Sequence, residues 1–410
     1  MSESGFSAKW QSALLFCILC LASGRMLLKR ALTGDLWGVD SPFLYQAGTL
    51  GFNYFELGPI RRGLGGSIAH LLAGDMLVAT VRFHFLAAAC VAFAAALVYS
   101  RVAGPPSRRL AYAIVMIGIM LCWADDPGRT DMLVAALLAA AAVALQRGRA
   151  DWAAAAIGGG LFVHETSLIF GLPLIVALII ARGGPTAFNR RVMRRAALLL
   201  LASLGGYFAL GQMSTAPTQL MVDTVRDKFF PHKYVDWAIY YAVSGFRGVA
   251  TSICQNRTHP SYWIHPFGGI VVLAVVYLAT AWRFRSDPWV ALLAALPPFL
   301  FLCLVANDTF RWTLFAAFNI WLVGASRATV AGRSDAFGWL AVAAAIAVVP
   351  LTHPRFGKDV MAIYAGSPLI ERALHRFGVP RTPHLDQVLL TCDPDWRDVL
   401  GDNAGSDPPR

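Results

Sequence analysis

Residues 147–182 decide the fold, and they read RGRADWAAAAIGGGLFVHETSLIFGLPLIVALIIAR. Basic residues stand at both ends of the stretch, and two apolar runs fill it. A single helix of about 30 residues would be about 45 Å long and would place the basic ends on opposite faces of a membrane. Loops rich in Lys and Arg favour the cytoplasmic face, so both ends should share it. We therefore expect two short crossings with a turn near His164-Glu165.

This turn should lie below the outer membrane surface. Each arm would be only about 18–25 Å long, which is short of the roughly 30 Å hydrocarbon core. Ionisable side chains at such depth are tolerated where they face protein or a water-filled recess. The sequence therefore predicts a polar recess around His164 and Glu165.

The same pattern of apolar runs and basic gaps continues along the chain to about residue 350. Hydrophobic residues make up 57% of the chain and charged residues 14%, whereas a soluble chain carries about 25% charged residues. The mean hydropathy is +0.55. These values predict an all-α, polytopic transmembrane bundle, and they exclude a secreted enzyme, a nucleic-acid-binding protein and a disulfide-stapled scaffold.

The net charge of +11 does not indicate nucleic acid, because the arginines gather in short gaps between apolar runs. They are Arg101, Arg108, Arg109, Arg147, Arg149, Arg190, Arg191, Arg194, Arg195, Arg283, Arg285, Arg327 and Arg333.

Placing these gaps in the cytoplasm gives about eleven crossings with a cytoplasmic N-terminus. The expected spans are 11–25, 80–100, 110–124, 132–146, 152–163, 167–181, 196–212, 268–283, 289–305, 313–326 and 337–350. The first run lacks a cleavage site and a basic start, so we interpret it as a retained span. Residues 1–350 form the transmembrane domain, with outer loops 26–79 and 213–267, and residues 351–410 form an outer tail.

The first outer loop carries three candidate residues. Asp40 follows the first span and is suited to act as a general base towards a hydroxyl group. Arg61 and Arg62 lie between glycines, where guanidinium groups can hold a phosphate. The alternatives are that Asp40 caps the next helix and that both arginines reach lipid headgroups.

Two other outer turns share an Asp-x-x-Arg pattern. Asp126 precedes Arg129, and Asp308 precedes Arg311. One interpretation is an N-cap followed by an (i, i+3) ion pair within each turn. The other is a ring of acid–arginine pairs around one cavity mouth. Asp125 adds a second carboxylate beside Asp126, and like charges there favour proton transfer.

His164 and Glu165 are the candidates that are hardest to explain as structural. Exposing both to lipid would cost several kcal/mol. A divalent metal bound there is an alternative, but a single His–Glu pair is not a ligand set and HExxH is absent. We therefore expect no metal and no cofactor.

Taken together, Asp40 after the first span, the amphipathic loop that follows, the acidic pair Asp125-Asp126 and the short paired spans resemble the GT-C membrane glycosyltransferases. That resemblance implies a polyprenyl-phosphate sugar donor, a lipid, glycan or protein acceptor, and a role in cell-envelope glycan biosynthesis. It implies Asp40 as the catalytic base. Asp126, His164 and Glu165 are further catalytic candidates from the residues themselves, and His164-Glu165 and the arginine doublet depart from the pattern of the family. Arg61 and Arg62 would contact the lipid phosphate.

The remaining candidates for substrate binding are Asp125, Arg129, Asp308 and Arg311.

Other functions stay open. A transporter or lipid flippase would place charges near the midplane on broken helices. A polysaccharide polymerase or ligase would also be polytopic with long outer loops, and an assembly subunit would have no activity. The alanine- and arginine-rich composition indicates the cytoplasmic membrane of a bacterium, with membrane lipids as partners. Because the predicted cytoplasmic loops are short, an active site would lie on the outer face.

Overall fold

The structure is a computed structural model that describes residues 3–33, 42–58, 60, 63–102, 106–124, 128–213, 218–228, 236, 239–240, 246–258, 260–280, 289–306, 309–326, 339, 342–346 and 391–395. All secondary structure in these residues is helical. The longer helices are α1 (Glu3–Thr33), α5 (Met76–Tyr99), α6 (Pro106–Ala124), α7 (Asp131–Gln146), α8 (Ala150–Leu161), α9 (Thr166–Ala181), α10 (Arg190–Met213), α14 (Pro260–Thr280), α15 (Trp289–Val305) and α16 (Thr309–Ser326). The shorter ones are α2 (Pro42–Leu50), α3 (Tyr54–Leu57), α4 (Gly63–Leu72), η1 (Pro185–Ala187), α11 (Thr218–Arg226) and α13 (Phe246–Thr258).

The chain is a helical membrane protein. Among the described helices, Met76–Tyr99, Pro106–Ala124 and Arg190–Leu210 are long and apolar enough to cross a membrane, and α7, α9 and α15 are shorter apolar helices. Every predicted span up to 313–326 coincides with a long helix, but α1 extends well beyond 11–25. The last predicted span, 337–350, lies mostly outside the described residues. The number of crossings stays a prediction.

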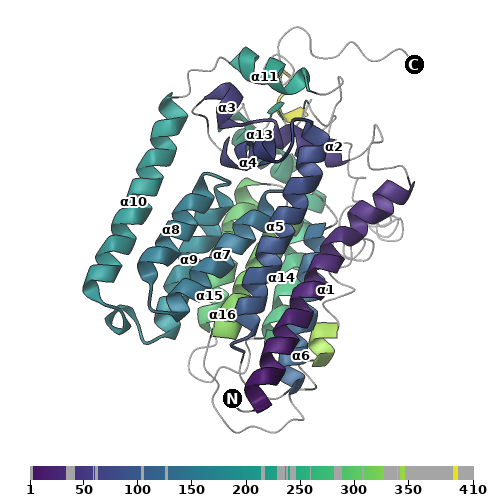
Figure 1. Cartoon of the computed structure of the whole chain (residues 1–410). Helices are drawn as coiled ribbons and strands as arrows, with labels where there is room; N and C mark the ends of the chain where they lie inside the picture. The colour runs from purple at the N-terminus through teal and green to yellow at the C-terminus, as the bar shows by residue number, and fades with distance from the viewer. Residues whose placement is uncertain are drawn as a thin grey trace.

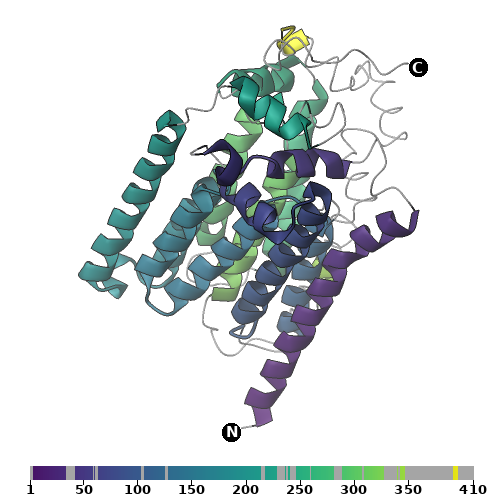
Figure 2. The same ribbon diagram turned by 45° about the horizontal axis from the view of Figure 1, so that its top comes forward.

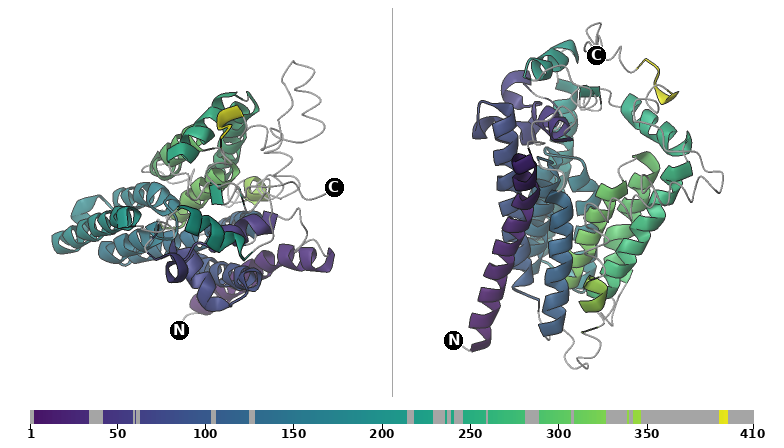
Figure 3. Two further views of the ribbon diagram at one scale, coloured as in Figure 1. Left: turned by 90° about the horizontal axis from the view of Figure 1, so that it is seen from above. Right: turned by 90° about the vertical axis from the view of Figure 1, so that its right-hand side faces the viewer.

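The long helices form one bundle in which α7 lies near the middle. Helix α5 packs against α1 and α7, α8 packs between α7 and α10, and α9 packs against α15. Helix α16 packs against both α14 and α15. Seen from the side, the purple and blue N-terminal helices and the green C-terminal helices form two sides of the bundle (Figure 3, right). Helix α10 lies at its edge (Figure 1).

Small residues let the two arms of the predicted short hairpin, α8 and α9, approach closely. A Cβ added at Gly160 would lie 2.2 Å from Ser167 Oγ, and one at Gly171 would lie 2.5 Å from the side chain of Ile157. Close backbone approach through small residues is how helices associate in lipid, where no hydrophobic effect drives them together. The hairpin that the basic ends of residues 147–182 predict is therefore present as two packed helices.

Proline interrupts the backbone bonding of α15, and a buried amide compensates for it. Pro298 has no N–H to offer the carbonyl of Ala294, four residues earlier. Asn319 on α16 is fully buried, and its Nδ2 donates to Ala294 O at 2.8 Å and to Phe170 O on α9 at 2.9 Å. One side chain thus joins α9, α15 and α16 and satisfies carbonyls that would otherwise be costly in lipid.

Short helices cover one end of this bundle. Helices α2, α3 and α4 lie there together with α11 and α13 (Figures 1 and 2). We call this end the outer end and the opposite end, where α1 begins, the inner end. A Cβ at Gly66 would lie 1.9 Å from Phe52 O, so α4 crosses the preceding backbone in direct contact. Within the predicted outer loop 26–79, α2, α3 and α4 therefore form a layer of short helices.

Candidate functional site at the outer end

The predicted site residues fall into two groups. Arg129, His164, Glu165 and Arg311 lie in the described part of the chain, at the outer ends of α7, α9 and α16. The other predicted residues lie outside it, and they are Asp40, Arg61, Arg62, Asp125, Asp126 and Asp308.

A buried ion pair joins α7 to α16. Asp131, the first residue of α7, is only 1% exposed. Arg311 Nε donates to its Oδ1 at 2.7 Å, and the adjacent guanidinium nitrogen donates to the same oxygen. Arg129 Nη1 lies 3.8 Å from Oδ2. Arg311 thus binds a carboxylate of another helix. A ring of acid–arginine pairs would contain such contacts between helices, whereas Asp308, the partner that a pair within the turn requires, lies outside the described residues.

Buried indole groups lie beside this ion pair. The guanidinium carbon of Arg311 lies 4.9 Å from the centre of the Trp312 ring. Trp123, at the outer end of α6, packs against Phe315 one turn along α16. Both tryptophans are almost fully buried, and within the described residues neither indole N–H has a hydrogen-bond acceptor. These groups are donors that a bound hydroxyl or phosphate oxygen would satisfy.

The turn between α8 and α9 carries a second polar group. His164 Nδ1 accepts the N–H of Thr166 at 3.2 Å, so the neutral imidazole carries its proton on Nε2. Glu165 Oε2 lies 3.6 Å from the same Nδ1, and Glu165 Oε1 accepts the hydroxyl of Tyr207. Tyr207 comes from α10 and is buried. This arrangement brings a carboxylate, an imidazole and a phenol together, and the side chains of His164 and Glu165 are 15% and 28% exposed.

Gly65 of α4 lies close to one chain neighbour of each polar group. A Cβ at Gly65 would lie 3.0 Å from Thr130 Cγ2 and 3.9 Å from Val163 Cγ1. Thr130 lies between Arg129 and Asp131, and Val163 precedes His164. The ion pair of Asp131 with Arg311 and the turn at His164 are therefore both near Gly65 in the chain segments that adjoin it. Helix α4 begins directly after Arg61 and Arg62, the predicted phosphate-binding arginines.

A buried histidine fixes the turn that leads into α7. His84, fully buried on α5, accepts the N–H of Gly128 through Nδ1 at 3.3 Å, and its Nε2 lies 3.0 Å from Ser23 O on α1. Gly128 has φ of +93°, and a Cβ there would lie 2.4 Å from Thr80. Only glycine suits both the backbone angle and the contact.

Metal ligation has no support in the described residues, where no three His, Cys, Asp or Glu side chains lie together as a ligand set.

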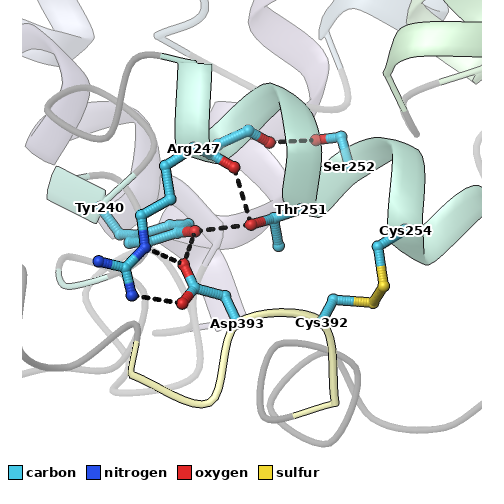
Figure 4. The surroundings of a disulfide bond; sticks show 8 residues. Tyr240, Arg247, Thr251, Ser252, Cys254, Cys392 and Asp393 are labelled. Carbon is cyan, nitrogen blue, oxygen red and sulfur yellow. Dashed lines mark hydrogen bonds and ion pairs between the residues drawn. A yellow bond between two sulfur atoms is a disulfide. The ribbon is translucent and has the colours of Figure 1, made fainter.

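A disulfide that the sequence analysis did not predict lies at the same end of the bundle. Cys254 on α13 is bonded to Cys392 in the C-terminal tail (Figure 4). Next to it, Asp393 accepts bonds from Arg247 Nε at 2.7 Å and from Tyr240 Oη at 2.5 Å. Burial, followed by the nearby Asp393 carboxylate, raises the pKa of Tyr240 to about 12. Cysteines 138 positions apart show no spacing motif, so only the folded chain reveals the bond.

Comparisons with known proteins give one partial likeness. No family model matches the chain, and no solved structure matches it. The probable multidrug resistance protein NorM of Idiomarina loihiensis is 30% identical over 146 residues. That match covers 34% of this chain and 31% of the NorM protein, so the chain spans less than a third of that relative's length.

Proposed function

We propose that this protein is a membrane glycosyltransferase that moves a sugar from a polyprenyl-phosphate donor to a hydroxyl acceptor at the outer end of the bundle. The observation that carries the proposal is the proximity of Gly65 on α4 to Thr130 and Val163, because these residues adjoin the two polar turns and α4 follows the predicted phosphate-binding arginines in the chain. A donor anchored in the bilayer by its lipid tail would reach such a site sideways, with its phosphate at the depth of the turns.

The chemistry of transfer fits the residue types at this end. As the acceptor oxygen bonds to the anomeric carbon, a carboxylate accepts the hydroxyl proton. The bond from that carbon to the phosphate oxygen breaks, and the phosphate leaves with the electron pair. Arginine guanidinium groups stabilise the departing phosphate. We assign the base to Asp40 and the phosphate contact to Arg61 or Arg62, with Glu165 as the second candidate base.

The disulfide supports placing the outer end outside the cytoplasm. Stable disulfides form in oxidising compartments such as the bacterial periplasm. Cys254 belongs to the predicted outer loop 213–267, and Cys392 belongs to the predicted outer tail. We therefore propose that the protein lies in the inner membrane of a bacterium, with α2–α4 and α13 on the periplasmic side and the N-terminus in the cytoplasm.

Transport is the second candidate, and the likeness to the multidrug resistance protein favours it over sugar transfer. A transporter places polar groups near the midplane on interrupted helices. Asn319 fits that description, because it lies about 15 Å along α16 from its outer end and contacts the proline-containing helices α9 and α15. A polysaccharide polymerase or ligase remains a variant of the first candidate.

The experiment that tests sugar transfer uses membranes with matched amounts of wild type and variants. Radiolabelled polyprenyl-phosphate sugars are supplied, and label in lipid and glycan is counted. We expect Asp40→Asn to lose transfer at least a hundred-fold, as removal of a general base does. Asp223→Asn, on the exposed face of α11, is the matched control and should retain wild-type transfer.

Other outcomes revise the proposal in defined ways. Loss only in His164→Ala with Glu165→Gln would move the base to the turn between α8 and α9. Absence of transfer by the wild type from every donor, together with reduced accumulation of fluorescent drugs in cells that express it, would replace transfer by transport.

A further inference from the structure

Three arginines from different helices meet at the inner end. Arg101 follows α5, and Arg147 and Arg182 directly follow α7 and α9. Arg101 Nη1 donates to Gln146 Oε1 at 2.8 Å, and Arg182 Nη1 donates to the carbonyl of Leu145. Both side chains are thus anchored on the last turn of α7, immediately beside Arg147. We call these three residues the inner arginine cluster.

No carboxylate in the described residues neutralises the inner arginine cluster. The described carboxylate nearest to it in sequence, Asp151, is engaged by Arg149 at 3.2 Å. Partial burial and then the neighbouring charges of Arg147 and Arg182 lower the pKa of Arg101. A helix C-terminus favours one cation through its dipole, which accounts for each arginine separately. It does not account for three exposed guanidinium groups held together, since their mutual repulsion opposes that arrangement.

An apolar hollow lies directly beside the cluster. It is lined by Ala142, Leu145, Gln146, Leu178, Ala181, Arg182 and Ser326. Two of these residues join α7 to α16, because Gln146 Nε2 donates to Ser326 Oγ at 2.9 Å. At the same end, the ring of Trp152 is 63% exposed and is covered by the guanidinium of Arg149. Exposed tryptophan beside arginine is typical of the membrane–water interface.

We infer that the inner arginine cluster binds the phosphate headgroup of an anionic membrane lipid at the inner ends of α5, α7 and α9. Guanidinium groups bind phosphate oxygens bidentately. Arg101 lies close enough to Arg147 and Arg182 for their charges to lower its pKa, so one doubly charged headgroup would relieve the repulsion within the cluster. Basic pockets between transmembrane helices at this depth are a known way of holding such headgroups. The inference does not depend on whether the outer end transfers sugars or transports substrates.

Native mass spectrometry of the detergent-solubilised full chain tests the site, with cardiolipin, phosphatidylglycerol or phosphatidylcholine added. We expect cardiolipin to bind most tightly. Phosphatidylcholine should not stay bound to the protein in the mass spectrometer. Each basic residue near a membrane surface contributes about 1 kcal/mol, which is about five-fold in affinity. Arg101→Gln with Arg147→Gln should therefore weaken cardiolipin binding roughly 25-fold. The control, Arg194→Gln with Arg195→Gln, also removes two positive charges at the inner end. It should change the affinity for cardiolipin less than three-fold.

Several outcomes would overturn the inference. An equal loss in the Arg194/Arg195 control would mean diffuse attraction to basic surface, and no loss in the Arg101/Arg147 variant would place the lipid elsewhere. Displacement of cardiolipin by millimolar inorganic phosphate would indicate a site for a free anion. Because Arg101 also joins α5 to α7, Arg147→Gln alone provides a variant that breaks no hydrogen bond shown in the structure. It should weaken binding about five-fold.

Discussion

Replacing Arg311 by Met should strongly destabilise the bundle. The substitution leaves the Asp131 carboxylate, which is 1% exposed, without the two charge-assisted hydrogen bonds that it accepts. Breaking a buried ion pair by removing one partner costs about 3–5 kcal/mol, because the other charge stays buried. Arg129 lies 3.8 Å from the second carboxylate oxygen and retains part of the compensation. We therefore expect a loss near the lower limit, about 3 kcal/mol.

The measurement is the free energy of unfolding in mixed micelles of dodecyl maltoside and SDS, followed by tryptophan fluorescence. Trp312 lies beside the guanidinium and should report the change locally. Asp131→Leu with Arg311→Met removes both charges, and this double variant should be more stable than Arg311→Met alone. A loss below about 1 kcal/mol in the single variant would refute the assignment of a buried pair. The assignment would also be refuted if the double variant lost as much free energy of unfolding as Asp131→Leu and Arg311→Met lose separately, added together.

Three further predictions concern the rest of the chain. Gly66→Ala should displace α4, since its Cβ would lie 1.9 Å from Phe52 O, and protease added from the outer side should cleave this layer several-fold faster than in wild type. Asn319→Leu should cost about 1–2 kcal/mol in the same micelle titration, because two carbonyls lose their donor. Arg247 lowers the pKa of Asp393, so the tail contact should be stable above the ordinary value of about 3.9 and should weaken as the pH falls through the lowered pKa. With the disulfide reduced, an acid protease should then release the tail at low pH. Release that increases as the pH rises would contradict this expected pH dependence.

Much of the helical framework follows from where the charges interrupt apolar sequence. The predicted spans 132–146, 167–181 and 289–305 differ by at most one residue at either end from α7, α9 and α15. Charged or glycine-rich segments border each of them, so hydropathy and helix ends coincide. Helix α1 extends beyond the predicted span 11–25 at both ends, from Glu3 to Thr33, because a helix can continue past the apolar run that hydropathy detects.

The site was less predictable because its contacts join distant parts of the chain. Arg311 and Asp131 are 180 positions apart, and their pairing depends on how α16 packs against α7. Tyr207 lies in an apolar run, where an aromatic side chain is ordinary and nothing indicates its bond to Glu165. Local sequence does indicate which outer turns are polar. It does not indicate which helix supplies the partner.

The disulfide also limits how many times the C-terminal third can pass through the bilayer. Cys254 and Cys392 must lie on the same face to form their bond, so the chain between them crosses an even number of times. Helices α14, α15 and α16 supply three passages between these cysteines, provided that each crosses. Parity then requires one more passage after Ser326, and the predicted span 337–350 supplies it. Introducing a fifth passage into this segment, for example by inserting a stretch of leucine, would put the two thiols on opposite sides and abolish the covalent link.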